Sequence, residues 1–594
     1  MTFVRTLLTT SLLSFALATG ACKEPDPNAF ETHVENIRDP AKRASGITGL
    51  EGLVKTVVSS EKKTERLDEF VAKAIPALEE VWDEAPEQHE KILLMLRDAA
   101  RPEASTIWNK ALGLDGSSEA RKRSILALEG IRKARATGSA EAVRTEFTKL
   151  IANPKNDEGD EEENGRVRML MAETLGALRD KASVDVLVTS LGQSRDKQPV
   201  SVHRAAATAL GQIGDASLKA VDALLTVTFR VPDIATSKNV GVRAKQALVA
   251  IGEPAIPRVV EMLRGKHAEV QKLAAEASAE QEGLNQLVIA QTAASILGAM
   301  GLPSAADALL EVYPKSDCVA GAAAPKKDKD GEEADDGGEG IAFAQLRAVI
   351  ANALGLIGDP KATEALCQCS LTSKNPGDMY EILNALGRVG GTAAVECLNV
   401  AIKTAVYSDD AVEKDFVLEP RWESARFAIL AAGPGDLAKV EEAMAAASSD
   451  PKVAKELEAW KPGLEIAKKC GTDKDCFLTT LRDSSADWFA REKSAVELSR
   501  LADGDPKVAA EIAKAYKVRN PDARVTMAWL PAKMLRDKKC PECAAALEAV
   551  LDAEKLSTDA KFQAPVLLAR DTIAKLSQDE AAAAAAPAAE PAKP

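Results

Sequence analysis

The stretch VHRAAATALGQIGD, residues 202–215, decides the fold of this chain, because imperfect copies of it recur along the sequence. The copies are RVRMLMAETLGALRD at 166–180, QTAASILGAMG at 291–301, LRAVIANALGLIGD at 346–359 and YEILNALGRVGG at 380–391. The Leu-Gly steps at Gly176 and Gly211 lie 35 residues apart, and those at Gly355 and Gly387 lie 32 apart. A period of this length is typical of solenoids, in which each repeat contacts its neighbours and buries a continuous core.

Each repeat predicts a helix, a tight turn and a second helix. Leu210 and Ile213 fall on one face of the first helix at helical spacing. Gly214 can adopt a positive φ and end that helix. Asp215 then stands where the N-cap of the second helix belongs, as Asp359 does in a later copy. An isolated pair would leave apolar surface in water, so the pairs must stack.

The composition also favours an all-α fold. Apolar residues make up 46% of the chain and aromatic residues only 4%. Alanine and leucine are strong helix formers, and small side chains let helices pack closely. We therefore predict an α-solenoid, a right-handed superhelix of helix pairs, in which the second helices line a long concave groove.

The repeats resemble HEAT repeats, in particular the phycobilin-lyase-like type with its Val-Arg, Ala-Leu-Gly and Ile-Gly-Asp elements. The resemblance is clear from about residue 167 to 404 and weaker on either side. In that family the arginines and aspartates tend to form ladders between neighbouring repeats. The resemblance therefore implies structural roles for Arg168, Arg204, Arg243, Arg347, Gly176, Gly211, Asp215, Gly355 and Asp359.

Changes in composition suggest how the chain is divided. We expect a signal peptide at 1–21, a lipidated tether at 22–38, degenerate HEAT-like repeats at 39–153, an acidic disordered loop at 154–165, clear repeats at 166–406 with an acidic disordered insertion at 320–340, degenerate repeats at 407–578 and a disordered Ala/Pro tail at 579–594. Acidic, glycine-containing stretches are too polar to form a packed core, so we predict loops there.

The first residues are typical of an export signal. Arg5 precedes a short apolar run at 7–18, which is too short to span a bilayer as a mature helix. Small residues then lead to Cys22, which resembles the acylated cysteine of a bacterial lipoprotein lipobox, although that motif usually has leucine where this chain has Thr19. The resemblance implies a lipid anchor on Cys22 and an exported protein held at a membrane of the periplasm or at the outer membrane. The alternative is plain secretion after cleavage near Ala21.

Eight cysteines remain besides Cys22, and an even number in an exported protein predicts disulfides. Cys470 and Cys476 flank a polar turn and could close a short loop. Cys540 and Cys543 form a CPEC motif at the start of a predicted helix. A metal site or a redox centre is the alternative use of these residues, but one CxxC among helices matches neither a four-ligand zinc site nor a thioredoxin-like unit.

The remaining four cysteines belong to neighbouring repeats. Cys367 and Cys369 lie about 200° apart around a predicted helix, so they should face different neighbours. We expect one to pair backward with Cys318 and the other forward with Cys397. The spacing leaves open which cysteine pairs in which direction.

The sequence carries no motif for enzyme chemistry. Phosphate-binding loops, nucleophile elbows and HExxH motifs do not occur, and the four histidines are scattered. The net charge of −14, without a basic stripe, argues against nucleic-acid binding. The acidic DKDG at 328–331 lacks the other ligands of an EF-hand. Deoxyhypusine hydroxylase resembles this repeat type but needs several His-Glu pairs, and this chain has one, at His89. We expect no catalytic residue, metal or cofactor.

These observations predict a non-enzymatic, lipid-anchored HEAT-repeat scaffold of the bacterial cell envelope. Its concave face would bind a protein or peptide, and its lipid would anchor it to the membrane. One alternative is an enzyme or cofactor carrier of the bilin-lyase kind that uses the groove. Another is an envelope structural or assembly protein without a specific ligand.

Overall fold

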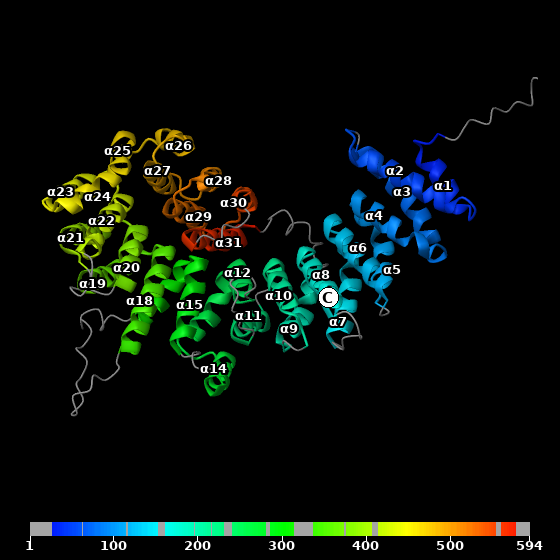
Figure 1. Ribbon diagram of the computed structural model, residues 1–594, viewed down its shortest axis with the longest axis horizontal. Helices are drawn as coiled ribbons and strands as arrows, with labels where there is room; N and C mark the ends of the chain where they lie inside the picture. The colour runs from blue at the N-terminus through cyan, green and yellow to red at the C-terminus, as the bar shows by residue number, and fades with distance from the viewer. Residues whose placement is uncertain are drawn as a thin grey trace, which may run out of the picture. The chain divides into compact units, whose positions relative to one another are not determined.

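The computed structural model describes residues 26–61, 63–114, 117–152, 161–194, 197–214, 217–230, 240–280, 286–313, 337–373, 376–406, 414–553 and 560–577. Within these ranges the regular elements are all helices (Figure 1). The chain is all-α, and its helices stack as pairs in an α-solenoid, which confirms the fold class predicted from the repeats.

Contacts among the helices divide the chain into two units, Met1–Asp180 and Lys181–Pro594. The first unit contains α1 (Phe30–Arg38), α2 (Arg43–Val58), α3 (Lys63–Val81), α4 (His89–Ala99), α5 (Ser105–Ala111), α6 (Ser118–Ala134), α7 (Ala140–Ala152) and α8 (Glu161–Ala177). The second unit contains α9 (Val184–Gly192), α10 (Val200–Ile213), α11 (Leu218–Arg230), α12 (Val240–Ile251), α13 (Ile256–Leu263), α14 (Ala268–Glu280), α15 (Gln286–Met300), α16 (Ala306–Val312), α18 (Gly337–Ile357), α19 (Thr363–Thr372), α20 (Pro376–Val389), α21 (Thr392–Thr404), α22 (Lys414–Ala431), α23 (Leu437–Ala447), α24 (Pro451–Leu457), α25 (Lys461–Cys470), α26 (Lys474–Arg482), α27 (Trp488–Leu501), α28 (Pro506–Lys514), α29 (Pro521–Leu535), α30 (Pro541–Ala553) and α31 (Gln563–Leu576).

The turn inside a repeat is built from its glycine and aspartate. Gly358 follows α18 with a φ of +69°, a conformation that glycine adopts without strain. Asp359 comes next, and its side chain accepts a hydrogen bond of 3.0 Å from the backbone N–H of Lys361. This cap begins a single 3-10 turn that leads into α19. Gly214 ends α10 with a φ of +68°, whereas Asp215 lies outside the described residues.

The glycine of each Leu-Gly step brings neighbouring first helices into close contact. A Cβ atom on Gly211 of α10 would lie 2.7 Å from the Cα atom of Ala247 on α12. A Cβ atom on Gly298 of α15 would lie 2.6 Å from the Cα atom of Ala353 on α18, and Gly355 meets α20 in the same way. A residue with a side chain would therefore force these helices apart.

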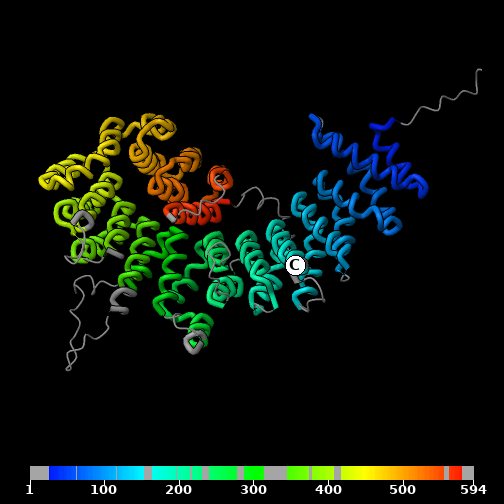
Figure 2. The backbone as a smooth tube through the Cα atoms, viewed as in Figure 1, coloured from blue at the N-terminus to red at the C-terminus, as the bar shows by residue number. Residues whose placement is uncertain are grey.

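This close approach curves the second unit. Most consecutive first helices pack extensively on one another, as α18 does on α15 and on α20, while second helices such as α19 and α21 pack less closely along the stack. A stack bends toward its more tightly spaced layer, because interaxial distance depends on the side chains at the contact. The curvature continues until α31 packs against α12 and α15 (Figure 2). We call this closed circuit of first helices the ring; it consists of α12, α15, α18, α20, α22, α27, α29 and α31.

Two helices begin inside stretches that we expected to be disordered. α8 starts at Glu161, within the acidic loop placed at 154–165, and α18 starts at Gly337, within the insertion placed at 320–340. The boundaries were set by composition, and a polar or acidic first turn is compatible with a helix because its N-terminus favours negative charge. The rest of both stretches and the tail at 579–594 lie outside the described residues.

Adding one methyl group at the Leu-Gly step should destabilise the second unit. We expect Gly211→Ala to lower the free energy of unfolding by about 1–3 kcal/mol, because overpacking at the contact with Ala247 exceeds the gain from alanine's helix propensity. Urea unfolding measures the change. The matched control is Gly192→Ala at the end of α9, where the added Cβ has only a 3.8 Å contact with Arg230. Equal midpoints for the two variants would contradict the proposed role of Gly211.

Candidate functional site

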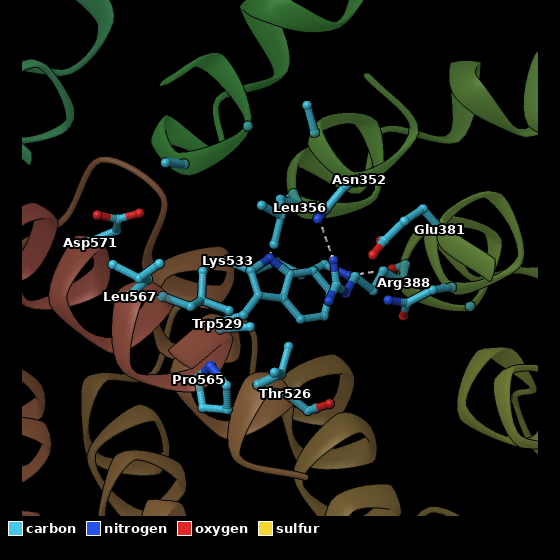
Figure 3. A pocket seen from close by; sticks show the side chains of 18 of the residues that line it. Asn352, Leu356, Glu381, Arg388, Thr526, Trp529, Lys533, Pro565, Leu567 and Asp571 are labelled. Atoms are coloured by element: carbon cyan, nitrogen blue, oxygen red, sulfur yellow. Dashed lines mark hydrogen bonds between the residues drawn. The ribbon is translucent and has the colours of Figure 1, made fainter. Parts of the chain in front are cut away.

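The ring encloses a cavity of about 1000 Å³. Its walls come from the ring helices, with contributions from the turns that follow α20 and precede α31 (Figure 3). The prediction that second helices line the concave side is wrong, because the first helices do so almost throughout. The physical reason is the tighter spacing of the first helices, which places them on the inner side of the curve.

The two sides of the ring meet through side chains that cap helix ends. Lys575 of α31 donates a hydrogen bond of 2.8 Å to the carbonyl of Met300, the last residue of α15. Lys533 of α29 donates one of 3.1 Å to the carbonyl of Arg388, near the end of α20. Trp529 donates its indole N–H to the carbonyl of Leu356, near the end of α18, at 2.8 Å.

Side chains of α27 cap the C-terminal end of α22 in the same way. Arg500 donates hydrogen bonds of 2.7 Å and 2.8 Å to the carbonyls of Leu430 and Ala431. The buried Lys493 donates one of 2.8 Å to the carbonyl of Ala432. The last carbonyls of a helix lack partners within the helix and carry partial negative charge, so a cation there is worth up to about 2 kcal/mol when partly buried.

Glycines make room for these caps. Gly301, Gly358 and Gly390 follow α15, α18 and α20, and each has a positive φ. A Cβ atom on Gly358 would lie 3.2 Å from Lys533 Cε, and one on Gly390 would lie 3.3 Å from an Arg500 guanidinium nitrogen. Gly358 and Gly390 therefore have two uses, since each ends its own helix and leaves room for the cation that caps the next first helix of the ring.

Burial changes the titration of the capping lysines. It lowers the pKa of Lys533 to about 8, and the neighbouring Arg500 acts in the same direction. Burial likewise lowers the pKa of Lys575 and of Lys493 to about 8. Removing an ammonium group from water disfavours its charged form, so closing the ring costs free energy that the helix-end contacts offset.

A buried ion pair joins α22 to α27 in the cavity wall. Both Glu492 carboxylate oxygens accept hydrogen bonds from one Arg426 guanidinium nitrogen, at 2.9 Å and 3.0 Å. The Thr526 hydroxyl of α29 also donates to Glu492. Burial works to lower the pKa of Arg426, but the charges of Glu492 and Asp522 outweigh it and the net shift is upward. Lys245 of α12 pairs with Asp571 of α31 at 3.1 Å where the ring closes.

None of the predicted repeat residues that the structure describes lines the cavity. Arg347 of α18 donates to the buried carboxylate of Asp378 on α20 and so links adjacent repeats. Arg168 is buried on α8. Arg204 and Arg243 lie on α10 and α12, and burial lowers the pKa of Arg243.

The described cysteines are joined as disulfides. Their pairs are Cys367–Cys397, Cys470–Cys476 and Cys540–Cys543. Cys369 is also disulfide-bonded, whereas the residues 318 and 22 lie outside the described part of the chain.

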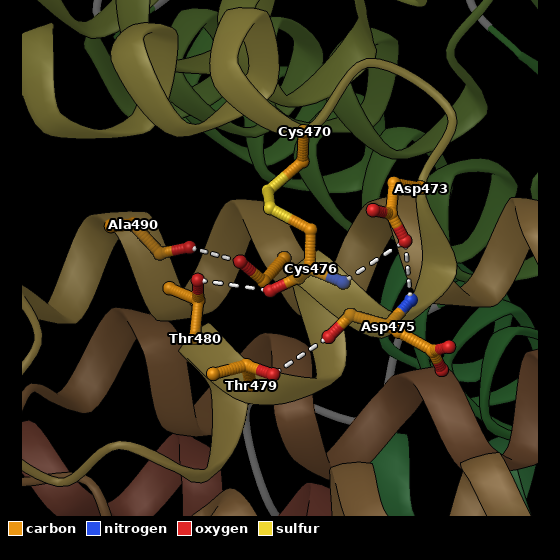
Figure 4. Close-up of a disulfide and its surroundings, with 8 residues drawn as sticks. Cys470, Asp473, Asp475, Cys476, Thr479, Thr480 and Ala490 are labelled. Atoms are coloured by element: carbon orange, nitrogen blue, oxygen red, sulfur yellow. Dashed lines mark hydrogen bonds between the residues drawn. A yellow bond between two sulfur atoms is a disulfide. The ribbon is translucent and has the colours of Figure 1, made fainter.

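The Cys470–Cys476 disulfide spans the turn between α25 and α26 (Figure 4). Asp473 caps α26 there, because its side chain accepts hydrogen bonds from the backbone N–H groups of Asp475 and Cys476 at 2.9 Å and 3.2 Å. The Cys367–Cys397 bond joins α19 to α21, the second helices of adjacent repeats. No group of three or more potential metal-ligating side chains was found in the described residues.

Sequence reasoning missed the residues that line the cavity. A signal was present for Lys533, which interrupts the apolar and small-residue run VTMAWLPAKML at 525–535. A lysine in a helix is ordinarily solvated, so this signal does not distinguish a buried cap from a surface residue.

Glu423 on α22 should make stability depend on pH. Burial raises the pKa of its carboxyl to about 7. The native state therefore binds a proton that the unfolded state, with a pKa of about 4.3, has released, and stability falls as pH rises between these values. We expect Glu423→Gln to remove up to about 3 kcal/mol of the loss between pH 5 and pH 8, measured by urea unfolding. The exposed Glu465→Gln is the control, and parallel pH profiles for both variants would refute the expectation.

Two stretches of the chain match known repeat families. Residues 160–233 match HEAT repeats, and residues 346–372 match the PBS lyase HEAT-like repeat. No curated protein matches the sequence.

Solved structures show distant similarity. An engineered protein is 17% identical with a TM-score of 0.28, over 88% of this chain and 98% of that chain. A Kap121p mutant is 14% identical with a TM-score of 0.24, over 93% of this chain and 68% of that one. A C-terminal fragment of the Chaetomium thermophilum cohesin loader SCC2 is 13% identical with a TM-score of 0.23, over 92% and 48%. The matched stretches and the stacked helix pairs show that the chain contains HEAT repeats within an α-solenoid.

Proposed function

We propose that this HEAT-repeat protein is a non-enzymatic scaffold of the bacterial cell envelope that holds a protein or peptide partner in the ring cavity. The observation that carries the proposal is the cavity itself, which is built from eight helices and is held in shape by contacts across the ring. Solenoids use their concave surfaces in this way because stacked repeats create an extended, curved face.

The cavity lining supports a binding role. Charged side chains such as Arg426 and Glu492 are paired within the wall, and apolar residues such as Leu356 and Leu567 lie between them. Among the described residues, the lining contains neither histidine nor cysteine, the groups that most often serve as general base and as nucleophile. A few polar groups set among apolar ones are typical of a site that binds and orients a ligand.

The export signal and the disulfides support an envelope location. The apolar run at 7–18 followed by Cys22 resembles the leader of a lipoprotein, and disulfides persist in oxidising compartments outside the cytoplasm. Among the described helices, none combines the length and apolar character that crossing a membrane requires.

A second function is favoured by the size of the cavity. A volume of about 1000 Å³ is at the upper end of the range of small-molecule sites. A cofactor carrier, as the resemblance to bilin lyases implies, would use the same walls.

The lipid anchor is tested by Cys22→Ser. We expect the wild-type chain to sediment with bacterial membranes after a high-salt wash and to incorporate a labelled fatty acid, because acyl chains resist removal by salt. The variant should lose the label and be found in the soluble fraction. Ser11→Ala, in the same leader, is the control and should behave as wild type. A Cys22→Ser chain that stays on membranes would overturn the anchor.

Occupancy of the cavity is tested by photo-crosslinking in intact cells. A benzophenone side chain replaces Leu567, which lines the cavity on α31 and is 43% exposed, or Leu371 on α19, which lies outside the cavity and is 45% exposed. We expect a discrete adduct at residue 567 and none at 371. A polypeptide-sized adduct supports the scaffold, and one of a few hundred daltons supports the carrier. Equal labelling at both positions would contradict both functions.

A further inference from the structure

One face of the cavity presents two cations against an indole ring. Lys533 Nζ lies 4.7 Å from the centroid of the Trp529 ring, and Arg388 Cζ lies 5.8 Å from it. Figure 3 shows these three residues beside one another, with Arg388 coming from α20 and the other two from α29. The cluster thus bridges two walls of the ring.

These two cations differ from three other cations of the lining. Lys245 and Arg426 each form an ion pair with a carboxylate, and so does Arg500, which contacts Glu497 at 2.9 Å. In the described part of the chain, Arg388 Nη1 donates to the Asn352 side chain at 2.8 Å, and Lys533 donates to a backbone carbonyl. Neither forms an ion pair there with a carboxylate. Two adjacent cations in a cavity wall, neither of them held in an ion pair, favour the entry of an anion.

A carboxyl group of the wall adds a constraint on that anion. Glu381 and Arg388 both lie on α20 and both line the cavity. The Glu381 Oε2 atom is buried without a hydrogen-bond partner. Burial raises the pKa of this carboxyl, while the charge of Arg388 and a hydrogen bond with Asn384 act in the opposite direction. A protonated carboxyl can donate a hydrogen bond to an incoming oxygen, whereas an ionised one would repel a multiply charged group.

We propose that the ring cavity binds the carboxylate of its ligand between Arg388 and Lys533, against the face of Trp529. The planar guanidinium fork matches a carboxylate, and Lys533 supplies a second charge-assisted hydrogen bond. A doubly charged phosphate fits less well, because Glu381 and the Glu492 carboxylate also face the cavity. This inference rests on the proposed function in that the same cavity is the binding site.

The surroundings indicate what the carboxylate is attached to. Leu356, Pro565 and Leu567 line the cavity near Trp529, so the part of the ligand next to its carboxylate is apolar (Figure 3). The C-terminal carboxylate of a peptide with an apolar last residue has this chemistry, and so does a free organic acid with an apolar body. Both sources would place the same group at the same two cations.

The experiment is isothermal titration calorimetry on the full chain in detergent. The probes are a pool of hexapeptides with apolar last residues, the same pool as C-terminal amides, 4-phenylbutyrate as the free acid, and inorganic phosphate. We expect the acid peptides to bind about tenfold to a hundredfold more tightly than the amides, since charge-assisted hydrogen bonds differ by that much from neutral ones. Arg388→Gln and Lys533→Met should each remove that difference. Lys439→Met, at an exposed ion pair on α23, should keep it.

The acid-amide comparison uses only the wild-type chain, so it remains decisive if a variant fails to fold. Acids and amides of equal affinity, no binding of any acid, or phosphate that competes as well as the acids would each overturn the inference. Tighter peptide binding assigns the carboxylate to a chain terminus, and tighter 4-phenylbutyrate binding assigns it to a free acid. An adduct at residue 567 together with equal acid and amide affinities would leave the proposed function standing and reject only this inference.

Discussion

The close approach of neighbouring first helices at the Leu-Gly steps is the constraint on which the second unit depends. At Gly211 and Gly298 the facing residue is alanine, and the missing Cβ lets two helix backbones nearly touch. Tight spacing in one layer of a two-layer stack must produce curvature toward that layer. The curvature brings α31 back to α12, and the enclosed cavity is the result.

Closing the ring creates an electrostatic problem that the chain solves with its own helix ends. Lys533 and Lys575 leave water when the walls meet, and their pKa values of about 8 reflect that cost. The carbonyls at the ends of α15 and α20 would otherwise lack partners, and they accept hydrogen bonds from these ammonium groups. Each ammonium group thus finds an acceptor and each carbonyl a donor, so these hydrogen bonds fix the walls at the ends of the helices. A cavity fixed in this way is preorganised, which reduces the cost of binding.

The repeat residues were predictable because their roles are local. Asp359 caps the turn that follows its own helix, and Gly358 adopts the positive φ that the turn requires. We predicted structural roles for the repeat glycines. They contact the next first helix because the short repeat period places consecutive first helices side by side. The side of the solenoid that faces the cavity was predicted wrongly. Sequence periodicity shows that a helix has an apolar face, but it does not show which layer is more tightly spaced.

The sequence by itself determined the all-α repeat fold, the turn chemistry and the residue types available for disulfides. Only the tertiary structure decided that the solenoid closes, and which side chains meet inside it. Lys575 caps a carbonyl 275 residues away, and Trp529 donates to one 173 residues away. Small rotations between successive repeats add up over such distances, so contacts across the ring depend on the sum of many packing angles. No local pattern encodes that sum, and for this reason the Arg388 and Lys533 cluster emerges only from the folded molecule.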